Sequence, residues 1–328
     1  MIYRNLGKTG FEISKIALGT WQVGGKWGTK FDHIIADKIL NKAVDNGVNF
    51  IDTADVYGNG ESEKAIGRLL KQRSERIYVA TKCGRRLKPH TSESYTPAAM
   101  QKFVEGSLKN MGLETLDLMQ LHCPPTEVFY RPEIFEVFDR LKEEGKILNL
   151  GVSVEKVEEG IKALEYENVT TVQIIFNMFR QRPAERFFRL ASANNVGIIV
   201  RTPLASGLLS GTLKKDSKFE KDDHRTFNRE GERFDKGETF SGIDYETGLK
   251  AVGKLKKIFP GNKNFAAIAL KWILMHEEVS CVIPGASKPE QVKSNLLAEN
   301  LPNLTEYEMY EVDEIYRNDI KTLVHHFW

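Results

Sequence analysis

Several features that would assign this chain of 328 residues to a specialised class are scarce or missing. Its three cysteines, Cys83, Cys123 and Cys281, are too few for a disulfide framework and lack the spacing of a zinc site. No apolar run approaches the ~20 residues of a membrane-spanning helix, and residues 1–7 lack the apolar core of a signal peptide. We therefore expect a cytoplasmic protein in a reducing compartment, with no metal and no membrane partner.

A strong net charge is also missing. The chain has 47 basic and 45 acidic residues, which gives a formal charge of +2. This balance argues against binding to nucleic acid or to a membrane surface through net charge. The hydrophobic share of 41% and the charged share of 28% are ordinary for a globular protein. The length fits either two domains or one α/β barrel of about 250 residues with insertions.

Short apolar runs alternate with amphipathic stretches along the chain. Several of the runs are apolar at almost every position, as in parallel strands that are buried on both faces. The stretches between them have the spacing of amphipathic helices, and proline marks several expected helix starts. Eight strands that alternate with helices favour a single (β/α)8 barrel over residues 1–328, with a doubly wound open sheet as the alternative. The expected strands cover 16–19, 48–51, 77–81, 116–121, 147–152, 172–176, 198–200 and 279–283.

Three segments lie outside this alternation. Residues 3–14 have a glycine-containing turn between two β-prone stretches, which predicts a hairpin before the barrel. Residues 212–245 have few apolar positions and predict a long loop after the seventh strand, either a plain solvated insertion or a lid. Residues 303–328 predict a helical stretch and a C-terminal tail that ends in Trp328.

Four polar residues follow the second, third and fourth expected strands. Asp52 and Tyr57 follow the second strand, Lys82 the third and His122 the fourth. Neighbouring strands lie about 4.8 Å apart, and the active sites of α/β barrels lie at the carboxyl ends of the strands. We therefore expect these four side chains to meet at one end of the barrel.

Their chemistry suits the reduction of a carbonyl group. A tyrosine hydroxyl has a pKa of about 10, which a nearby Lys82 cation would lower. Asp52 would hold Lys82, His122 would orient the carbonyl, and Tyr57 would donate a proton as hydride reaches the carbon. No activated serine or cysteine nucleophile is evident, so the hydride must come from a cofactor.

The chain resembles the aldo/keto reductase family. The resemblance is carried by FIDTADVYG at 50–58, ATK at 80–82 and LH at 121–122, and it continues through motifs near the C-terminus such as IPGASKPEQ at 283–291. It implies a (β/α)8 barrel and NADPH-dependent reduction of aldehydes or ketones, with NADH also possible. By resemblance, Asp52, Tyr57, Lys82 and His122 are the catalytic residues.

The resemblance also implies where the cofactor binds. Ser153 and Gln173 would bind the nicotinamide carboxamide, the backbone of residues 202–208 would hold the pyrophosphate, and the helix that begins at Pro289 would hold the adenosine half. No GxGxxG fingerprint follows the first strand, so this is no Rossmann site. The implied cofactor residues are Gly19, Thr20, Trp21, Asp52, Ser153, Gln173, Arg201, Thr202, Pro203, Leu204, Ser206, Gly207, Leu208, Gly285, Ser287, Lys288, Gln291 and Asn295.

Three positions depart from the family pattern, and one of them is Val154, which stands where asparagine is common and so removes an expected polar contact to the cofactor. Arg201 stands where many relatives have an aromatic residue, and it could stack on the nicotinamide or bind an anionic substrate or the pyrophosphate. Ser287 replaces an arginine that is common near the 2′-phosphate, which weakens the case for strict NADP preference, although Lys288 or Arg225 could compensate. Strand alternation predicts that Cys83 and Cys123 point away from the catalytic residues.

The sequence leaves the substrate, the reaction direction and the oligomeric state open. Aromatic residues on strand-end loops are candidates for the substrate pocket. The enzyme could work mainly as a sugar or polyol alcohol dehydrogenase. Some barrels of this family are instead nicotinamide-sensing subunits of potassium channels. Those proteins lack a histidine at the position equivalent to His122, so the presence of His122 favours an enzyme. The pocket candidates are Trp21, Trp27, Phe129, Tyr130 and Trp328.

Overall fold

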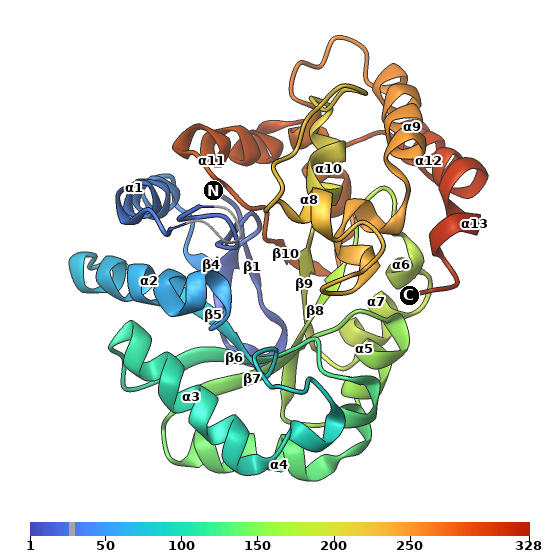
Figure 1. Ribbon diagram of the computed structural model, residues 1–328. Helices are drawn as coiled ribbons and strands as arrows, with labels where there is room; N and C mark the ends of the chain where they lie inside the picture. The colour runs from blue at the N-terminus through green and yellow to red at the C-terminus, as the bar shows by residue number, and fades with distance from the viewer. Residues whose placement is uncertain (26–29) are drawn as a thin grey trace.

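The computed structural model describes residues 1–25 and 30–328 and shows a barrel of parallel strands surrounded by helices (Figure 1). The eight strands pair in chain order. Parallel bridges from Ile16 to Val282 and from Gly19 to Gly285 join the first strand to the last. The sheet is therefore closed, which confirms the predicted (β/α)8 barrel and excludes the open sheet. The strands are β3 (Leu18–Gly19), β4 (Phe50–Asp52), β5 (Tyr78–Cys83), β6 (Leu116–His122), β7 (Ile147–Ser153), β8 (Val169–Ile175), β9 (Gly197–Arg201) and β10 (Val279–Val282).

Helices follow the strands and cover the outside of the barrel (Figure 1). Capping residues mark the two ends of α3 (Pro97–Met111). The Thr96 hydroxyl accepts a hydrogen bond from the Ala99 amide at 3.2 Å, and Gly112 ends the same helix with φ of 65°. The covering helices are α1 (His33–Val44), α2 (Glu61–Gln72), α3 (Pro97–Met111), α4 (Pro132–Glu143), α5 (Val157–Ala163), α6 (Arg182–Glu185), α7 (Phe187–Ala193), α10 (Phe265–Leu274) and α11 (Pro289–Leu296).

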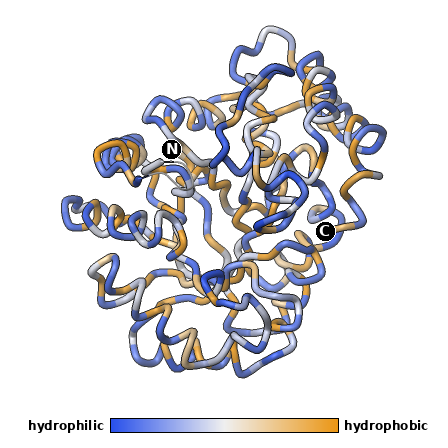
Figure 2. The backbone as a smooth tube through the Cα atoms, in the orientation of Figure 1, coloured by the Kyte–Doolittle hydropathy of each residue, from blue (hydrophilic) through white to orange (hydrophobic). Residues whose placement is uncertain are grey.

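The predicted N-terminal hairpin is present as β1 (Tyr3–Asn5) and β2 (Glu12–Ser14), which pair antiparallel. Leu6 and Ile13 of the hairpin are buried in a cluster with the barrel-interior residue Phe50. Arg4 donates to the Val279 carbonyl at the start of β10, so the hairpin lies at the amino-terminal end of the strands. A larger core fills the space between strands and helices, and hydrophobic positions recur along both (Figure 2). Burial of this apolar surface is the main force that stabilises the barrel.

The chain between β9 and α10 is longer than the other connections and carries its own short elements. The C-terminal segment packs near it. The Trp328 indole lies over the Arg180 guanidinium at 4.0 Å and donates from Nε1 to Asp235 Oδ2 at 3.0 Å. Within the described residues, no helix is long and apolar enough to cross a membrane. The elements are α8 (His224–Phe227), η6 (Lys236–Glu238), η7 (Phe240–Gly242), α9 (Tyr245–Ile258), α12 (Glu306–Ile315), η9 (Tyr316–Ile320) and α13 (Lys321–Val324).

Candidate active site

The structure brings the four predicted catalytic residues together at the carboxyl ends of the strands. Lys82 Nζ forms an ion pair with Asp52 and also donates to the Thr53 carbonyl at 2.9 Å. The same Nζ lies 5.2 Å from the centroid of the Tyr57 ring. The rings of Tyr57 and His122 are 6.0 Å apart and nearly perpendicular, at 83°.

A tight turn after β4 places Tyr57 next to Lys82. Gly58 and Asn59, directly after the tyrosine, both have φ of 56°, a left-handed conformation that glycine and asparagine adopt most easily. A Cβ at position 58 would also lie 2.8 Å from a ring carbon of Phe31. The sequence after Tyr57 therefore suits the turn that directs the tyrosine toward β5.

The second oxygen of Asp52 accepts two further hydrogen bonds. Gln120 Nε2 donates to Oδ2 at 3.1 Å and Gln173 Nε2 at 2.8 Å. Asp52 and Lys82 are only 2% and 1% exposed. Both carboxylate oxygens of Asp52 therefore have hydrogen-bond partners within the protein and are shielded from solvent. Sequence reasoning missed Gln120, although its position two residues before His122 in β6 directs it to the same face.

Burial determines the protonation of the site. It acts to lower the pKa of Lys82, but the attraction and hydrogen bonds of Asp52 and Tyr57 together outweigh it and the pKa is raised, so the lysine is a cation. Burial lowers the pKa of His122 well below its usual value, reinforced by Arg85 and Lys82, so the imidazole is neutral at pH 7. Burial raises the pKa of Tyr57, and Lys82 only opposes this. The expected net lowering of the Tyr57 pKa is therefore not found, because desolvation exceeds the lysine's effect.

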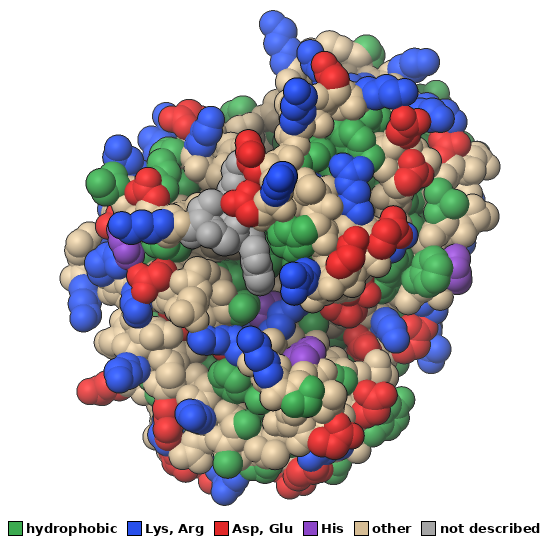
Figure 3. All heavy atoms as spheres, in the orientation of Figure 1, with side chains coloured by type: hydrophobic (Ala, Val, Ile, Leu, Met, Phe, Trp, Pro, Cys, Tyr) green, Lys and Arg blue, Asp and Glu red, His purple; other side chains and the backbone are tan. Residues whose placement is uncertain are grey.

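A cavity of about 710 Å³ opens at this end of the barrel. The face in Figure 3 is hollowed near its centre, where basic and histidine side chains are visible. Asp52, Tyr57 and His122 line the cavity, whereas Lys82 lies behind them. Most residues that the family resemblance assigns to the cofactor line it as well. These are Gly19, Thr20, Trp21, Asp52, Gln173, Arg201, Thr202, Pro203, Leu204, Ser206, Gly207, Gly285, Ser287, Gln291 and Asn295.

Three residues of the expected cofactor set are not among those that line the cavity. The Ser153 hydroxyl is buried 3.5 Å from Cys123 Sγ. Leu208 is buried in the hydrophobic core. Lys288 is the N-cap of α11, and its amide donates to Gln291 Oε1 at 3.2 Å.

The prediction that Cys123 points away from the site is wrong. It follows the last residue of β6 and has φ of 47°, so strand alternation no longer applies to it. Its Sγ lies 3.5 Å from Arg201 Nη2, beside the cavity wall. Burial raises the pKa of Cys123 to about 11, so it is a neutral thiol.

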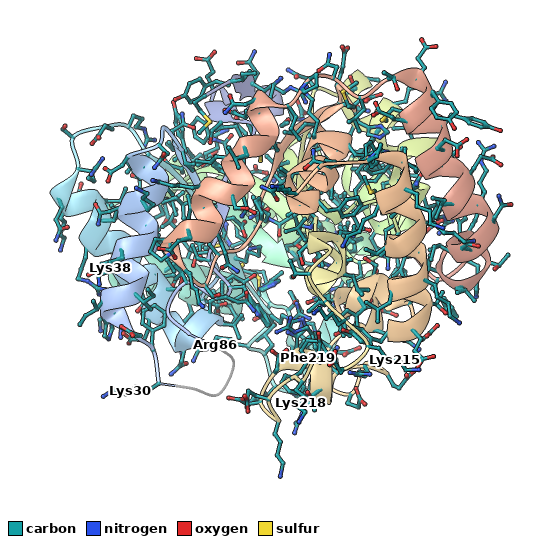
Figure 4. The ribbon with its side chains drawn as sticks, turned by 90° about the horizontal axis from the view of Figure 1, so that it is seen from above. Lys30, Lys38, Arg86, Lys215, Lys218 and Phe219 are labelled. Atoms are coloured by element: carbon teal, nitrogen blue, oxygen red, sulfur yellow. The ribbon has the colours of Figure 1, made fainter. Side chains whose placement is uncertain are left out.

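The segment 212–245 forms one wall of the cavity. Asp223, His224, Arg225, Phe234 and Glu238 of this segment all line it. Lys215, Lys218 and Phe219 lie at the same end of the barrel as Arg86, which follows β5 (Figure 4). The segment is therefore not the plain solvated insertion that one alternative described. Its lining residues were missed from sequence, except Arg225, because their charged surroundings are typical of any exposed loop.

The aromatic candidates for the substrate pocket separate clearly. The Trp21 ring contacts the rings of Tyr57 and Phe234, with centroids 5.3 and 6.0 Å away. Phe129 is buried in the core and Tyr130 is exposed. Trp328 packs behind the wall rather than in the cavity, and Trp27 lies outside the described residues.

A (β/α)8 barrel with a Tyr, Lys, Asp and His cluster at a deep strand-end cavity has the architecture expected of a barrel oxidoreductase. The family model for the aldo/keto reductases matches residues 15–317, so the chain belongs to the aldo/keto reductase family, whose members use nicotinamide cofactors. Its curated relatives include the aldo-keto reductase YhdN of Bacillus subtilis, 30% identical over 90% of this chain and 87% of that protein. The NADH-specific methylglyoxal reductase of Escherichia coli is 28% identical over 90% of this chain and 93% of that protein. The solved glycerol dehydrogenase AKR11B4 of Gluconobacter oxydans has a TM-score of 0.79 and 30% identity, with 97% and 96% of the two chains covered.

Proposed function

We propose that this protein is an NADPH-dependent carbonyl reductase in which Tyr57 donates the proton. The observation that carries the proposal is the convergence of Tyr57, Lys82 and His122 at the cavity. NADPH, when bound, supplies the hydride. The small-molecule carbonyl substrate would place its oxygen between the Tyr57 hydroxyl and the neutral His122 imidazole.

The residues of the chain divide the proton chemistry between them. Tyr57 Oη gives its proton to the carbonyl oxygen and becomes a phenolate. The Lys82 cation stabilises that phenolate, which opposes the effect of burial on the tyrosine pKa. Asp52 and its two glutamine donors keep Lys82 in place. His122 acts as a neutral hydrogen-bond donor that orients the carbonyl.

The cavity lining fits a dinucleotide. Thr202, Ala205 and Ser206 have left-handed φ values of 52°, 46° and 54°, which bend the backbone after β9 into a concave turn suited to a pyrophosphate. At the far end, Ser287 and Asn295 line the cavity together with Lys263, which sequence reasoning did not identify. An exposed lysine there supports NADPH over NADH, because it adds positive charge for a 2′-phosphate. Comparable kcat/KM values with NADPH and NADH would contradict a strict preference for NADPH.

Tyr57→Phe tests the assignment. It should lower kcat/KM for propionaldehyde by about 10²–10⁴-fold, because the general acid is removed while the ring remains. NADPH affinity, measured by fluorescence titration, should stay within a few-fold. Tyr130→Phe, at a residue that is 66% exposed, is the matched control and should retain activity. Activity of Tyr57→Phe within a few-fold of wild type would remove the proposed role.

Oxidation of a polyol is the second candidate, since one solved relative is a glycerol dehydrogenase. The same residues would act in reverse, with Tyr57 taking the proton of the alcohol. Rates with glycerol and NADP⁺ against glyceraldehyde and NADPH would decide the favoured direction. The regulatory alternative is disfavoured, because a subunit that only senses nicotinamide does not require His122 beside the Tyr57 ring.

A further inference from the structure

Two arginines line the cavity close enough to His122 to lower its pKa, and they take no part in the proton chemistry. Arg85 follows β5, and its Nη1 lies 3.4 Å from His122 Nε2. Arg201 ends β9. Both line the cavity, and both approach the same oxygen of Glu238, with Nη2 of Arg85 at 2.9 Å and Nη1 of Arg201 at 3.4 Å from Oε1.

The second acidic residue near these arginines does not balance their charge. Glu155 Oε1 lies 4.0 Å from Arg85 Nη2. Burial, together with Glu238 and Asp235, raises the pKa of Glu155 to about 8, so this carboxyl is mostly protonated at pH 7. One carboxylate, that of Glu238, therefore faces two guanidinium cations at the cavity wall.

Other charges close by leave this excess in place. Burial lowers the pKa of Arg180 to about 9, so it remains a cation at pH 7. Arg180 packs against the Trp328 ring, and the negative charge of Asp235 offsets its positive charge. Burial raises the pKa of Cys123, so its thiol carries no charge at pH 7. Its Sγ and the carboxylates of Glu155 and Glu238 lie within 4.8 Å of one another, close enough to hold a cation. The two guanidinium groups at Glu238 oppose a cation there and favour an anion.

The geometry also limits where the anion sits on a substrate. Glu238 holds Nη2 of Arg85, so that Nη1 faces His122. A guanidinium only donates, so Arg85 Nη1 donates to His122 Nε2 at 3.4 Å in this contact, and the neutral ring donates from Nε2 to a substrate in its other tautomer. One substrate with oxygens on adjacent carbons is therefore able to reach both side chains at once. Arginine is well suited to bind a carboxylate at such a site.

We propose that Arg85, supported by Arg201, binds a carboxylate on the carbon next to the reacting carbonyl, so that the preferred substrates are 2-oxo carboxylates. The placement of the carbonyl on Tyr57 and His122 rests on the proposed function. The anion site itself rests on the two arginines, their shared carboxylate Glu238 and the protonated Glu155, and does not depend on the chemistry of Tyr57. Glu238 is a positioning residue that fixes the direction of the Arg85 guanidinium.

The kinetic test compares three carbonyls in the full-length enzyme. Glyoxylate carries a carboxylate next to the aldehyde, methylglyoxal a neutral oxygen, and propionaldehyde neither. Arg85→Gln should lower kcat/KM for glyoxylate by about 10–100-fold more than for propionaldehyde, because a hydrogen bond to a charged group is lost. Arg86→Gln, at the exposed neighbouring arginine (Figure 4), is the matched control and should leave the ratio unchanged.

Three outcomes overturn the proposal. In the first, Arg85→Gln reduces kcat/KM for glyoxylate and propionaldehyde equally. In the second, wild type prefers propionaldehyde to glyoxylate. In the third, methylglyoxal matches glyoxylate in both preference and dependence on Arg85, so that the site recognises a second oxygen but no charge. Hydration of the aldehydes affects every variant alike, and the comparison of substrates within wild type uses kcat/KM values calculated on the unhydrated aldehyde.

A binding measurement separates this proposal from the proposed function. Oxamate, a non-reacting analogue of a 2-oxo carboxylate, is titrated calorimetrically into the enzyme with NADPH. The Kd should rise at least about 10-fold in Arg85→Gln and stay unchanged in Arg86→Gln. If wild type reduces no carbonyl yet binds oxamate through Arg85, the reductase assignment fails and the anion site stands. Equal oxamate affinity in wild type and Arg85→Gln refutes the anion site whatever the activity.

Discussion

The two walls of the cavity are built differently. The strand-end wall includes Asp52 and Gln173, with Lys82 directly behind it, and all three are almost completely buried and bind residues of other strands. The wall formed by segment 212–245 is held in place more by contacts between residues that are close in sequence. Arg225 is paired with Asp223, two residues away, and remains partly exposed. Since one wall is fixed by the barrel and the other mainly by local contacts, we expect substitutions in the first to affect both fold and chemistry, and those in the second to affect chemistry alone.

Lys82→Met should give the largest effect. It removes the partner of a buried carboxylate and the cation beside Tyr57. The free energy of unfolding should fall by about 3–5 kcal/mol, and kcat/KM by about 10²-fold or more. Chemical denaturation and steady-state kinetics measure the two. The double variant Asp52→Asn with Lys82→Met should recover part of the stability and none of the activity.

Lys254→Met is the matched control for that ion pair. Lys254 Nζ lies 2.7 Å from Asp319, but the lysine side chain is 55% exposed, so solvent screens the attraction. The loss of stability should be at most about 1 kcal/mol, with unchanged activity. If Lys82→Met and Lys254→Met lower the free energy of unfolding by similar amounts, burial does not make the Lys82–Asp52 ion pair more important for stability than an exposed pair.

Asp55, in the loop after β4, is an exception among the buried polar residues near the strand ends. It is buried three residues after Asp52, yet its carboxylate has no side-chain hydrogen-bond partner among the described residues. Burial, together with nearby Glu63, raises its pKa from 3.8 to about 7. The folded protein thus keeps a proton that the unfolded chain loses. Stability from this group is fully present below pH 4 and is lost as pH rises to about 7.

Asp55→Asn should remove this pH dependence. Relative to wild type, its free energy of unfolding should increase between pH 4 and pH 8 by up to about 4 kcal/mol. Urea denaturation at both values measures the change. Asp117→Asn, at a carboxylate that accepts from Arg76 and from the Val79 amide, is the control and should show no such increase. If the difference in unfolding free energy between Asp55→Asn and wild type does not change with pH, Asp55 ionises in the folded protein as easily as in the unfolded chain.

The strand-end wall could be predicted from sequence, and the loop wall largely could not. Asp52, Lys82 and His122 lie at the ends of apolar runs, where barrel topology alone makes them neighbours. Glu238 and Arg85 are 153 positions apart in the sequence. Glu238 lies in segment 212–245, where the sequence has no hydrophobic periodicity and no expected strand that would place it. The misplacement of Cys123 has the same cause, because alternation is reliable only while the strand continues.

Gly237→Ala tests the support of the loop wall. A Cβ at this position would lie 2.4 Å from Arg180 Nη1 and 2.9 Å from Trp328 Cε2. The segment must shift, and Glu238 with it, so Arg85 loses its orientation. We expect kcat/KM for glyoxylate to fall by about 10-fold, because small misplacements near the reacting groups are costly. The melting temperature should change far less than in Lys82→Met. A large loss of stability instead would show that this wall is part of the folding core.

Gly253→Ala should have the smallest effect, and in the opposite direction. Gly253 lies inside α9, directly after the loop wall, and a Cβ there would meet nothing within 4 Å. Alanine favours the helix and restricts the unfolded chain, so the free energy of unfolding should rise by about 0.4–1 kcal/mol with unchanged kinetics. Any loss of glyoxylate activity here would mean that α9 transmits strain to Glu238. The loop wall would then be fixed by the helices around the barrel and not mainly by its own contacts.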